Sequence, residues 1–311
     1  MATTSFDRIE LMRTFVRIVE SGSLSAAAKQ LNTTQPTISR RLKALEHSID
    51  GRLIHRTTHQ LKLTELGQQY YAGARQLLAN WDAFESNVSG AALAPEGKLR
   101  IMAPHAFGQD LLVKPLTDFM RQFPKLKVEW QLHDDRSLTD FIAHDIDCAI
   151  QVGDVRDDNL VAIRIADIPR IVVAHPQLLS PDNTLNDNPN ELQRYPWLAL
   201  QTFYTEHIGL THIETGERRD ITFSPRFYTD SLYALRSAAV HGVGVGVGSE
   251  WLLNEDIRQG RLVNALPSWR ADPLPVFIVY PYANFYPAKL TAFVTFIREQ
   301  MVNVIHAVTR P

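Results

Sequence analysis

The sequence predicts a chain in two parts: an α-rich, basic winged helix-turn-helix at the N-terminus, and a larger α/β body behind one long helix. Three observations support this. Residues 21–67 hold two short helix patterns, a tight break between them and a basic hairpin. Residues 64–88 hold one long helix pattern. From Lys98 onward strand patterns alternate with helix patterns, which is typical of an α/β domain.

Composition sets the broad class. The 311 residues suffice for two or three domains, and an apolar content of 45% is that of a globular protein. No run of 18 apolar residues occurs, so we expect no membrane span, and residues 1–13 lack the pattern of a secretory signal. The single cysteine, Cys148, excludes an internal disulfide and fits a reducing compartment. We therefore expect a cytoplasmic protein.

Charge is distributed unevenly along the chain. Residues 1–64 carry ten Lys and Arg against five Asp and Glu, a net charge of +5. The whole chain carries −2, so the remainder carries −7. The negative net charge of the whole chain argues against a nucleic-acid-binding protein. The uneven distribution of charge argues for one, because a basic module on an acidic body lets DNA approach from one side.

Three helices are expected before the hairpin. The first spans 7–20, with an inner face of Ile9, Met12, Phe15 or Val16, and Val19. Ser23 can cap the second, whose helically spaced apolar residues are Leu24, Ala27, Ala28 and Leu31. Asn32 tolerates the left-handed conformation that a sharp turn requires. The third has Pro36 in its first turn and an apolar face of Ile38, Leu42 and Leu45.

The polar residues of the third helix have the chemistry of a DNA-reading surface. Gln pairs with adenine, Arg with guanine, and Ser or Thr with phosphate or a thymine methyl. The alternative is an ordinary helical hairpin with a solvated basic face. A basic hairpin at 51–63, with Arg52, Arg56, His59 and Lys62, favours DNA. The expected DNA contacts are Gln35, Pro36, Thr37, Ser39, Arg40, Arg41, Arg56, Thr57 and Thr58.

The long helix begins at Thr64, which can cap it, and runs to about Val88. From Tyr70 its apolar residues alternate at spacings of four and three, which is a heptad seam. A second copy of the helix is the simplest partner for this seam, and packing against the body is the alternative. The expected dimerisation residues are Tyr70, Leu77, Trp81, Phe84 and Val88.

The N-terminal residues resemble a known family. The patterns SxSAAAxxLxxxQPTISRxxxxLE and RLxxRTxxxxxLTxxG are similar to the winged helix-turn-helix of LysR-type transcriptional regulators. The match is nearly continuous over residues 6–67, and the layout downstream is also that of the family. In that family the long helix is a linker that dimerises.

The body shows the following elements from Lys98 onward. Strands are expected at 99–103, 126–132, 148–152, near 161–165 and 171–175, and at 197–202, 226–229, 243–247 and 276–280. Helices are expected at 110–123, 137–144, 232–241 and 289–304, with a hairpin at 208–223. This alternation implies a parallel sheet with helices on both faces. Residues 91–97 (AALAPEG) are expected to form a hinge.

The resemblance implies more about the body than periodicity does. It implies two α/β subdomains that resemble a periplasmic solute-binding protein, with the chain crossing between them twice. The expected division is a DNA-binding domain at 1–64, a linker helix at 65–90, a hinge at 91–97 and an effector-binding domain at 98–311. Within that domain, subdomain I is 98–168 with 276–305, and subdomain II is 169–275.

Effector contacts are expected where strands end, because ligands of open α/β sheets bind past the carboxyl ends of strands. The candidates are Pro104, His105, Ala106, Phe107, His133, Gln151, Thr202, Phe203, Thr229 and Asp230. Relatives often carry Ser or Thr at the position of Ala106 and Arg at that of Gln151. Both departures argue for a less anionic effector, or for none. His105 could be a pH-sensitive donor, or only a solvated turn histidine.

Three other interpretations were weighed, and only the first of them, a dinucleotide site, is rejected. The run Gly242–Gly248 lacks a GxGxxG pattern, and a helix precedes it rather than follows it, so we expect a close-packed strand instead of a dinucleotide site. Cys148 has no resolving partner and lies in a buried-strand pattern, which favours a structural thiol. His55 and His59 have the spacing of metal ligands but lie on the hairpin, where DNA contact is favoured.

The sequence therefore predicts a LysR-type regulator and no enzyme, metal or cofactor. Double-stranded DNA, a small-molecule effector and a second copy of the chain are the expected partners, in a homodimer or homotetramer, and RNA polymerase is a candidate. The alternatives are an effector-independent regulator that senses pH or redox state, a solute-binding or structural DNA protein, and an α/β enzyme with an accessory DNA-binding module.

Overall fold

The computed structural model describes residues 7–56, 61–89, 94–134, 146–179 and 187–309. It divides into two compact units, one made chiefly of Met1–Ala94 and the other chiefly of the residues from Pro95 onward. We call them the N-terminal unit and the body, and describe each by itself. No helix among the described residues is both long enough and apolar enough to cross a membrane.

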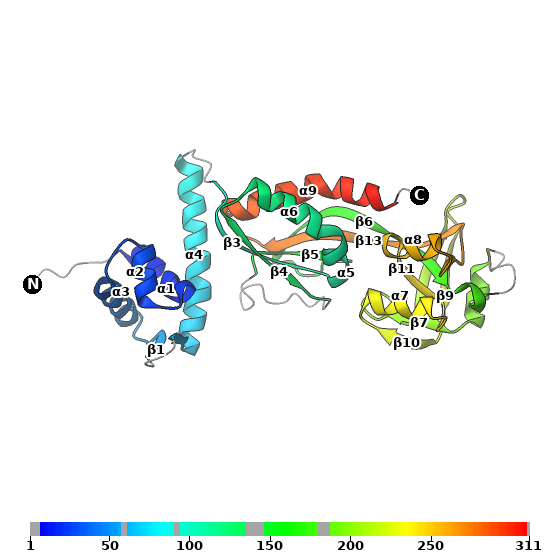
Figure 1. Cartoon of the computed structure of the whole chain (residues 1–311), viewed down its shortest axis with the longest axis horizontal. Coiled ribbons are helices and arrows are strands. Elements are labelled where there is room, and N and C mark those ends of the chain that lie inside the picture. The colour runs from blue at the N-terminus through cyan, green and yellow to red at the C-terminus, as the bar shows by residue number, and fades with distance from the viewer. Residues whose placement is uncertain (1–6, 57–60, 90–93, 135–145, 180–186, 310–311) are drawn as a thin grey trace, which may run out of the picture. The chain divides into compact units, whose positions relative to one another are not determined.

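The N-terminal unit is a small helical bundle with a two-stranded wing and one long helix (Figure 1). Its elements are α1 (Arg8–Ser21), α2 (Leu24–Gln30), α3 (Gln35–Ser48), β1 (Ile54–Arg56), β2 (Leu61–Leu63) and α4 (Glu65–Ser89). β1 and β2 pair antiparallel, with His55 opposite Lys62. The predicted helix-turn-helix and hairpin are therefore confirmed, although the hairpin tip at 57–60 lies outside the described residues.

The predicted helix boundaries of this unit have the expected physical causes. The Ser23 side chain accepts a hydrogen bond from Ala26 N at 3.1 Å, and Thr64 Oγ1 accepts one from Gly67 N at 2.9 Å. Asn32 has a φ of 50°, the left-handed conformation predicted for the turn. Pro36 lies in the first turn of α3, where its missing N–H costs nothing.

Helix α1 buries two faces rather than the single face that was predicted. Leu11, Phe15 and Ile18 pack into the core formed with α2 and α3, whereas Val16 packs with Ala74 and Leu78 of α4. The predicted face of Ile9, Met12 and Val19 is only half-buried. The reason is that α1 contacts α3 on one side and α4 on the other, so it needs two apolar stripes.

The body consists of two lobes joined by two long strands. The first lobe holds β3 (Gly97–Ala103), α5 (His105–Phe107), the π-helix η1 (Gly108–Leu112), α6 (Val113–Gln122), β4 (Leu126–Leu132), β5 (Cys148–Val152) and α9 (Ala288–Thr309). The second holds η2 (Pro176–Leu178), η3 (Pro189–Arg194), β7 (Trp197–Leu200), β8 (His207–His212), β9 (Arg218–Thr222), β10 (Pro225–Thr229), α7 (Leu232–Val240), β11 (Gly246–Ser249), α8 (Glu250–Arg258) and β12 (Val263–Asn264).

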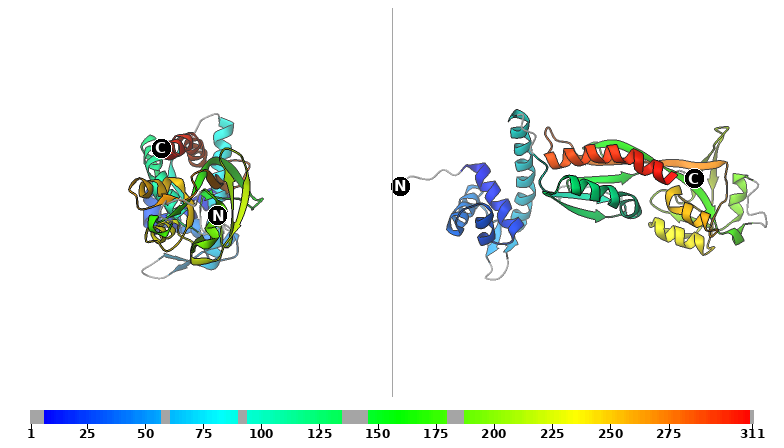
Figure 2. Two further views of the ribbon diagram at one scale, coloured as in Figure 1. Left: turned by 90° about the vertical axis from the view of Figure 1, so that its right-hand side faces the viewer. Right: turned by 45° about the horizontal axis from the view of Figure 1, so that its top comes forward.

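The joining strands are β6 (Leu160–Ala174) and β13 (Trp269–Pro281), and both run through the two lobes (Figure 2). Two separate strands were predicted near 161–165 and 171–175, but β6 is continuous. Pro169, which cannot donate to a ladder, is accommodated because the register with β13 shifts between Ala271 and Leu274. The chain therefore passes between the lobes twice.

The main sheet is mixed, so the prediction of a parallel sheet was wrong. β3 pairs in parallel with β4 and β5, whereas β13 pairs antiparallel with β5 and β6. The cause is the double passage: β6 leads the chain into the second lobe and β13 returns it in the opposite direction. Helices α6 and α9 lie side by side, and Phe119 contacts Phe293 and Phe296 at ring-centroid distances of 5.3 Å each (Figure 1).

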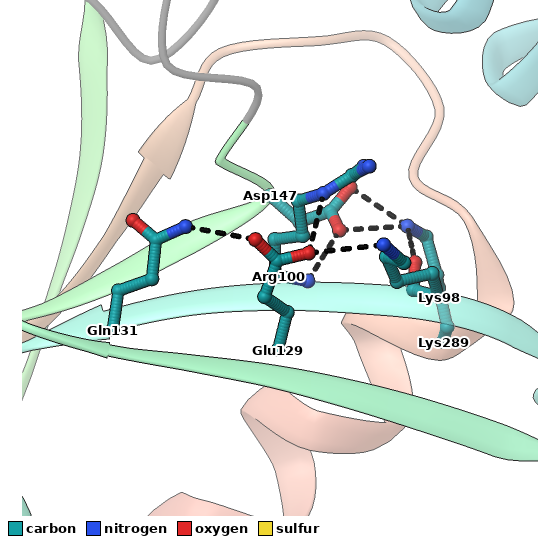
Figure 3. A network of polar contacts seen from close by, with 6 residues as sticks. All are labelled: Lys98, Arg100, Glu129, Gln131, Asp147 and Lys289. Carbon is teal, nitrogen blue, oxygen red and sulfur yellow. Dashed lines mark hydrogen bonds and ion pairs between the residues drawn. The ribbon is translucent and has the colours of Figure 1, made fainter. Parts of the chain in front are cut away.

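A polar network ties the first turn of α9 to the strands of the first lobe (Figure 3). Lys289 Nζ donates to the two carboxylate oxygens of Asp147 at 2.8 and 2.7 Å, and Asp147 Oδ2 also accepts from Arg100 N at 2.8 Å. Glu129 accepts hydrogen bonds from Lys98, Gln131 and Arg100. The bonds from Lys98 and then Gln131 are the largest causes that lower the pKa of Glu129.

The glycine-rich run ends in a close-packed strand, as predicted, but one part of the argument was incomplete. A side chain at Gly244 would place its Cβ 2.5 Å from Pro196 O, so only glycine fits against β7. Helix α7 precedes the run, but α8, which was not predicted, follows it directly. The predicted helix at 137–144 lies outside the described residues.

Candidate functional site

Helix α3 presents a polar face on an apolar base. Ile38, Leu42 and Leu45 are buried in the core of the N-terminal unit. Gln35, Pro36 and Arg40 are exposed, and Thr37 and Ser39 are partly exposed. The apolar base anchors the helix, so its other side is available to a DNA groove.

Not every predicted DNA contact has the same surroundings. Arg41 forms an ion pair with Glu10 of α1 and is mostly buried, so it fixes α3 to α1. Thr34 and Thr37 share a hydrogen bond of 2.9 Å between their hydroxyls at the start of α3. Arg56 ends β1, but its side chain, like Thr57 and Thr58, lies outside what the structure describes.

The predicted seam of α4 is divided between two sides of the helix. Tyr70 packs against Phe15 of α1 at 5.7 Å between ring centroids, and burial raises the pKa of its hydroxyl. Ala74 also faces α1. The helix therefore does have an apolar partner of its own within the unit, contrary to expectation. Leu77, Trp81 and Phe84 remain 59%, 42% and 42% exposed, and the side chain of Val88 is not described.

A cavity of about 70 Å³ lies in the body and is lined from both lobes. It includes eight of the ten residues predicted as effector contacts: Pro104, Ala106, Phe107, His133, Gln151, Thr202, Phe203 and Asp230. His105 and Thr229 do not line it. Thr229 Oγ1 accepts from Ser231 N at 3.1 Å, which holds the turn before α7.

His105 makes two contacts beside the cavity. Its backbone N donates to Asp134 Oδ1 at 2.7 Å, which caps α5. Its ring meets Tyr233 of the second lobe edge-on, with 6.5 Å between centroids. Burial, followed by the nearby carboxylate of Asp110, raises the pKa of Tyr233. His105 and Tyr233 thus form a contact between the lobes rather than a wall of the cavity.

The cavity also contains polar residues that sequence reasoning missed. Arg170 of β6, Ser249 at the end of β11 and Trp251 of α8 all line it. The sequence could have indicated Arg170, because it is a charged residue within the otherwise apolar strand segment Ile168–Ala174. A charged residue is rarely buried unless it has a partner. Gln151 is buried, and its side-chain amide donates to Asp154 O at 2.7 Å.

Cys148 is fully buried in β5, as predicted for a structural thiol. Burial raises the pKa of the thiol strongly, the charge of Asp147 raises it further, and Lys289 opposes both. Burial and the raised pKa both disfavour the thiolate, which is the reactive form of a cysteine. Among the described residues no three His, Cys, Asp or Glu side chains are grouped as a metal site.

Comparison with known proteins agrees with this arrangement. Residues 9–68 match the family model "Bacterial regulatory helix-turn-helix protein, lysR family", and residues 93–302 match "LysR substrate binding domain". The HTH-type transcriptional regulator PtxR of Pseudomonas aeruginosa is 31% identical over 287 residues, which is 92% of this chain and 91% of PtxR.

Two solved full-length structures share the fold. AphB of Vibrio cholerae, a virulence activator, has a TM-score of 0.56 and 26% identity, over 94% of this chain and 98% of AphB. CrgA of Neisseria meningitidis has a TM-score of 0.56 and 27% identity over the same shares, 94% and 98%. The chain therefore belongs to the LysR family of bacterial transcriptional regulators, with a DNA-binding helix-turn-helix domain followed by a substrate-binding domain.

Proposed function

We propose that this regulator binds an imperfect inverted repeat in double-stranded DNA as a dimer, or as a dimer of dimers. Each α3 occupies a major groove, and each wing contacts the adjacent backbone or minor groove. The observation that carries this proposal is the exposed row on α3, where Gln35 and Arg40 stand on a helix anchored by buried Ile38 and Leu42. Gln and Arg are the side chains that read adenine and guanine.

The exposed apolar patch of α4, made of Leu77, Trp81 and Phe84, supports dimerisation. Trp81 and Phe84 contact each other at 6.2 Å between ring centroids, so the patch is continuous. A second copy of α4 would cover it, as a heptad pattern requires. We keep the predicted division into a DNA-binding domain (1–64), linker (65–90), hinge (91–97) and effector domain (98–311).

The cavity of the body is the proposed effector site. It is concave, mainly apolar and carries a few polar groups, which are the features of a small-molecule pocket. A ligand that prefers one arrangement of the two lobes would shift the population of that arrangement and so change DNA binding. We infer regulation without catalysis, in the cytoplasm, with RNA polymerase as a further candidate partner.

The test of the DNA interface is Arg40→Ala. A preferred duplex is first selected from random DNA with the full-length protein, and affinities are then measured by fluorescence anisotropy at fixed salt, because phosphate contacts depend on salt. Arg40→Ala should weaken binding by about 1–3 kcal/mol and relax base preference at one position of each half-site.

The matched control is Arg121→Ala, which removes an exposed Arg that pairs with Asp118 on α6 of the body. It should leave the affinity for the selected duplex unchanged. If Arg40→Ala binds the selected and scrambled duplexes as the wild type does, α3 is not the reading helix.

A further inference from the structure

Arg170 is a buried cation whose terminal amino groups have no acceptor among the residues that the structure describes. Its side chain lines the cavity although the residue is only 8% exposed. Nε donates to Asp272 O at 2.6 Å, but Nη1 and Nη2 have no hydrogen-bond partner among the described residues. The Asp272 carboxylate is instead held by Arg218, with two bonds of 2.9 Å. A buried charge of this kind calls for an anion.

Burial is also the largest influence on the acid–base equilibrium of Arg170. It lowers the pKa of the guanidinium, against smaller opposing effects of Tyr204 and Asp272. Arg nevertheless stays charged in proteins. The surrounding protein therefore compensates this charge incompletely, as the hydrogen bonds already indicate.

Ser249 lies directly opposite Arg170 in the antiparallel pair of β11 and β6. Opposite residues of such a pair point to the same face of the sheet, so both side chains face the cavity that they line. Ser249 is 5% exposed, and its hydroxyl makes no hydrogen bond within the described residues, not even to the helix that it precedes. The hydroxyl is thus a second donor beside the guanidinium.

The N-terminus of α8 begins at this point and lacks a side-chain cap. The two other helices that start near the cavity are satisfied: Asp134 caps α5, and Ser231 Oγ accepts from Ala234 N of α7. Uncapped N–H groups and the helix dipole favour an anion at the start of α8. Glu250, in the first turn of α8, does not line the cavity.

Trp251 supplies a further donor from the same turn. Trp251 lines the cavity, and its indole Nε1 is buried without a hydrogen-bond partner among the described residues. A buried indole N–H usually has an acceptor, and one left without it costs free energy. Arg170, Ser249 and Trp251 therefore all line one cavity, and each carries a donor without an acceptor among the described residues.

The rest of the cavity limits what can carry the negative charge. Most of its wall is apolar, including Phe107, Ile150, Phe203 and Leu232. Asp134 and Asp230 also line it, and they repel a dianion about twice as strongly as a monoanion, which favours a ligand with a single negative charge. A cavity needs about 10–15 Å³ to hold one water molecule. This cavity, of about 70 Å³, therefore has room for several waters, or for a small molecule in their place.

We propose that the cavity binds a small monocarboxylate with an apolar body, its carboxylate held by the guanidinium of Arg170, the hydroxyl of Ser249, the indole N–H of Trp251 and the N-terminus of α8. The planar fork of Arg fits the two oxygens of a carboxylate. The proposal rests on the proposed function only in taking this cavity as the effector site. It departs from the expectation of a less anionic effector that Ala106 and Gln151 suggested, because the cation comes from β6.

The test uses the full-length protein and pairs of probes that differ only in charge. Benzoate is compared with benzamide, and butyrate with butyramide, by calorimetry and thermal shift at millimolar concentrations. Succinate and inorganic phosphate are tested alongside. We expect at least one monocarboxylate to bind and to raise the melting temperature, while its amide, succinate and phosphate do not.

The variants are Arg170→Gln and Trp251→Phe, which remove donors and keep most of the side-chain volume. Each should weaken the monocarboxylate at least tenfold. Arg164→Gln is the matched control, because Arg164 lies on the same strand but is exposed and pairs with Asp167. It should bind the probe as the wild type does. If Arg170→Gln does not fold, Arg170→Lys and Trp251→Phe carry the comparison.

Three results would overturn the proposal: no monocarboxylate binds the wild type, the amide binds as well as the acid, or the folded variants bind the acid as tightly as the wild type. Phosphate binding in place of carboxylate would overturn the ligand class. The affinity of each ligand-free variant for the selected duplex is measured separately. Unchanged DNA binding with no carboxylate binding refutes this inference alone and leaves the DNA-binding proposal intact.

Discussion

Asp256 shows how one buried charge holds a lobe together. Its side chain on α8 is fully buried and accepts hydrogen bonds from Arg236 of α7 at 3.0 Å and from Arg261 at 2.7 Å. Burial alone would raise the pKa of this carboxyl, but the bonds from Arg236 and Arg261 outweigh burial and lower it. The carboxylate therefore connects α7, α8 and the turn that follows α8.

Asp256→Asn should destabilise the folded protein by about 1.5–3 kcal/mol at neutral pH, since it removes charged hydrogen bonds at a buried site. Because the folded pKa is lowered, the contribution of Asp256 is complete above the unfolded value of about 3.9 and fades as the pH falls below it. The gap in free energy of unfolding between wild type and variant should thus be constant near neutral pH and shrink in acid. Urea unfolding across pH measures it.

The control is Asp118→Asn, at an exposed carboxylate paired with Arg121 on α6, which should change stability little. If wild type and Asp256→Asn have the same free energy of unfolding at neutral pH, or if the difference grows in acid, the charged hydrogen bonds of Asp256 do not stabilise the lobe as described.

Only some of the residues that line the cavity could be predicted from the sequence. Pro104, Ala106 and Phe107 could be predicted near the cavity, because strand ends are visible in the sequence. Arg170 could not, because its significance depends on lying opposite Ser249, 79 positions away in the chain, in a register that no local pattern specifies. Trp251 was not predicted as a cavity residue, because the helix α8 that carries it was not predicted.

Helix α4 has two apolar sides, of which one packs against α1 and the other is exposed. Ala74 and Leu78 face α1 within the unit, while Leu77, Trp81 and Phe84 are exposed. The heptad spacing in the sequence correctly marked an apolar helix. It could not separate the two sides, because Tyr70 and Ala74 belong to the same spacing as Trp81.

Trp81→Asp should convert the dimer to a monomer, because it places a charge in the patch that a second α4 would cover. Sedimentation equilibrium measures the oligomeric state, and anisotropy with the selected duplex should show weaker DNA binding at the same time.

Ile213→Asp is the matched control. Ile213 is an exposed large apolar residue of the second lobe of the body, whereas α4 belongs to the N-terminal unit. A Trp81→Asp protein that remains dimeric would show that α4 is not the interface.

The whole molecule combines a DNA-reading unit with a body built on two long strands. The sequence predicted both parts and most elements, since periodicity is a local property. It mistook the sheet for a parallel one and divided β6 in two, because strand direction depends on how the chain passes between lobes. That passage is a property of the assembled body and leaves no local pattern.

In the proposed dimer, two copies of α3 that are joined through α4 read two half-sites on one side of the duplex. Half-sites that are one helical turn apart lie on the same face of DNA. Inserting about half a turn, roughly 5 base pairs, between the selected half-sites moves them to opposite faces.

The most direct measurement is therefore the affinity of the wild-type protein for the selected duplex with and without this insertion, at fixed salt. We expect the insertion to lower the affinity to the level of the Trp81→Asp variant, although the sequence of each half-site is unchanged. Equal affinity for the two duplexes would contradict it.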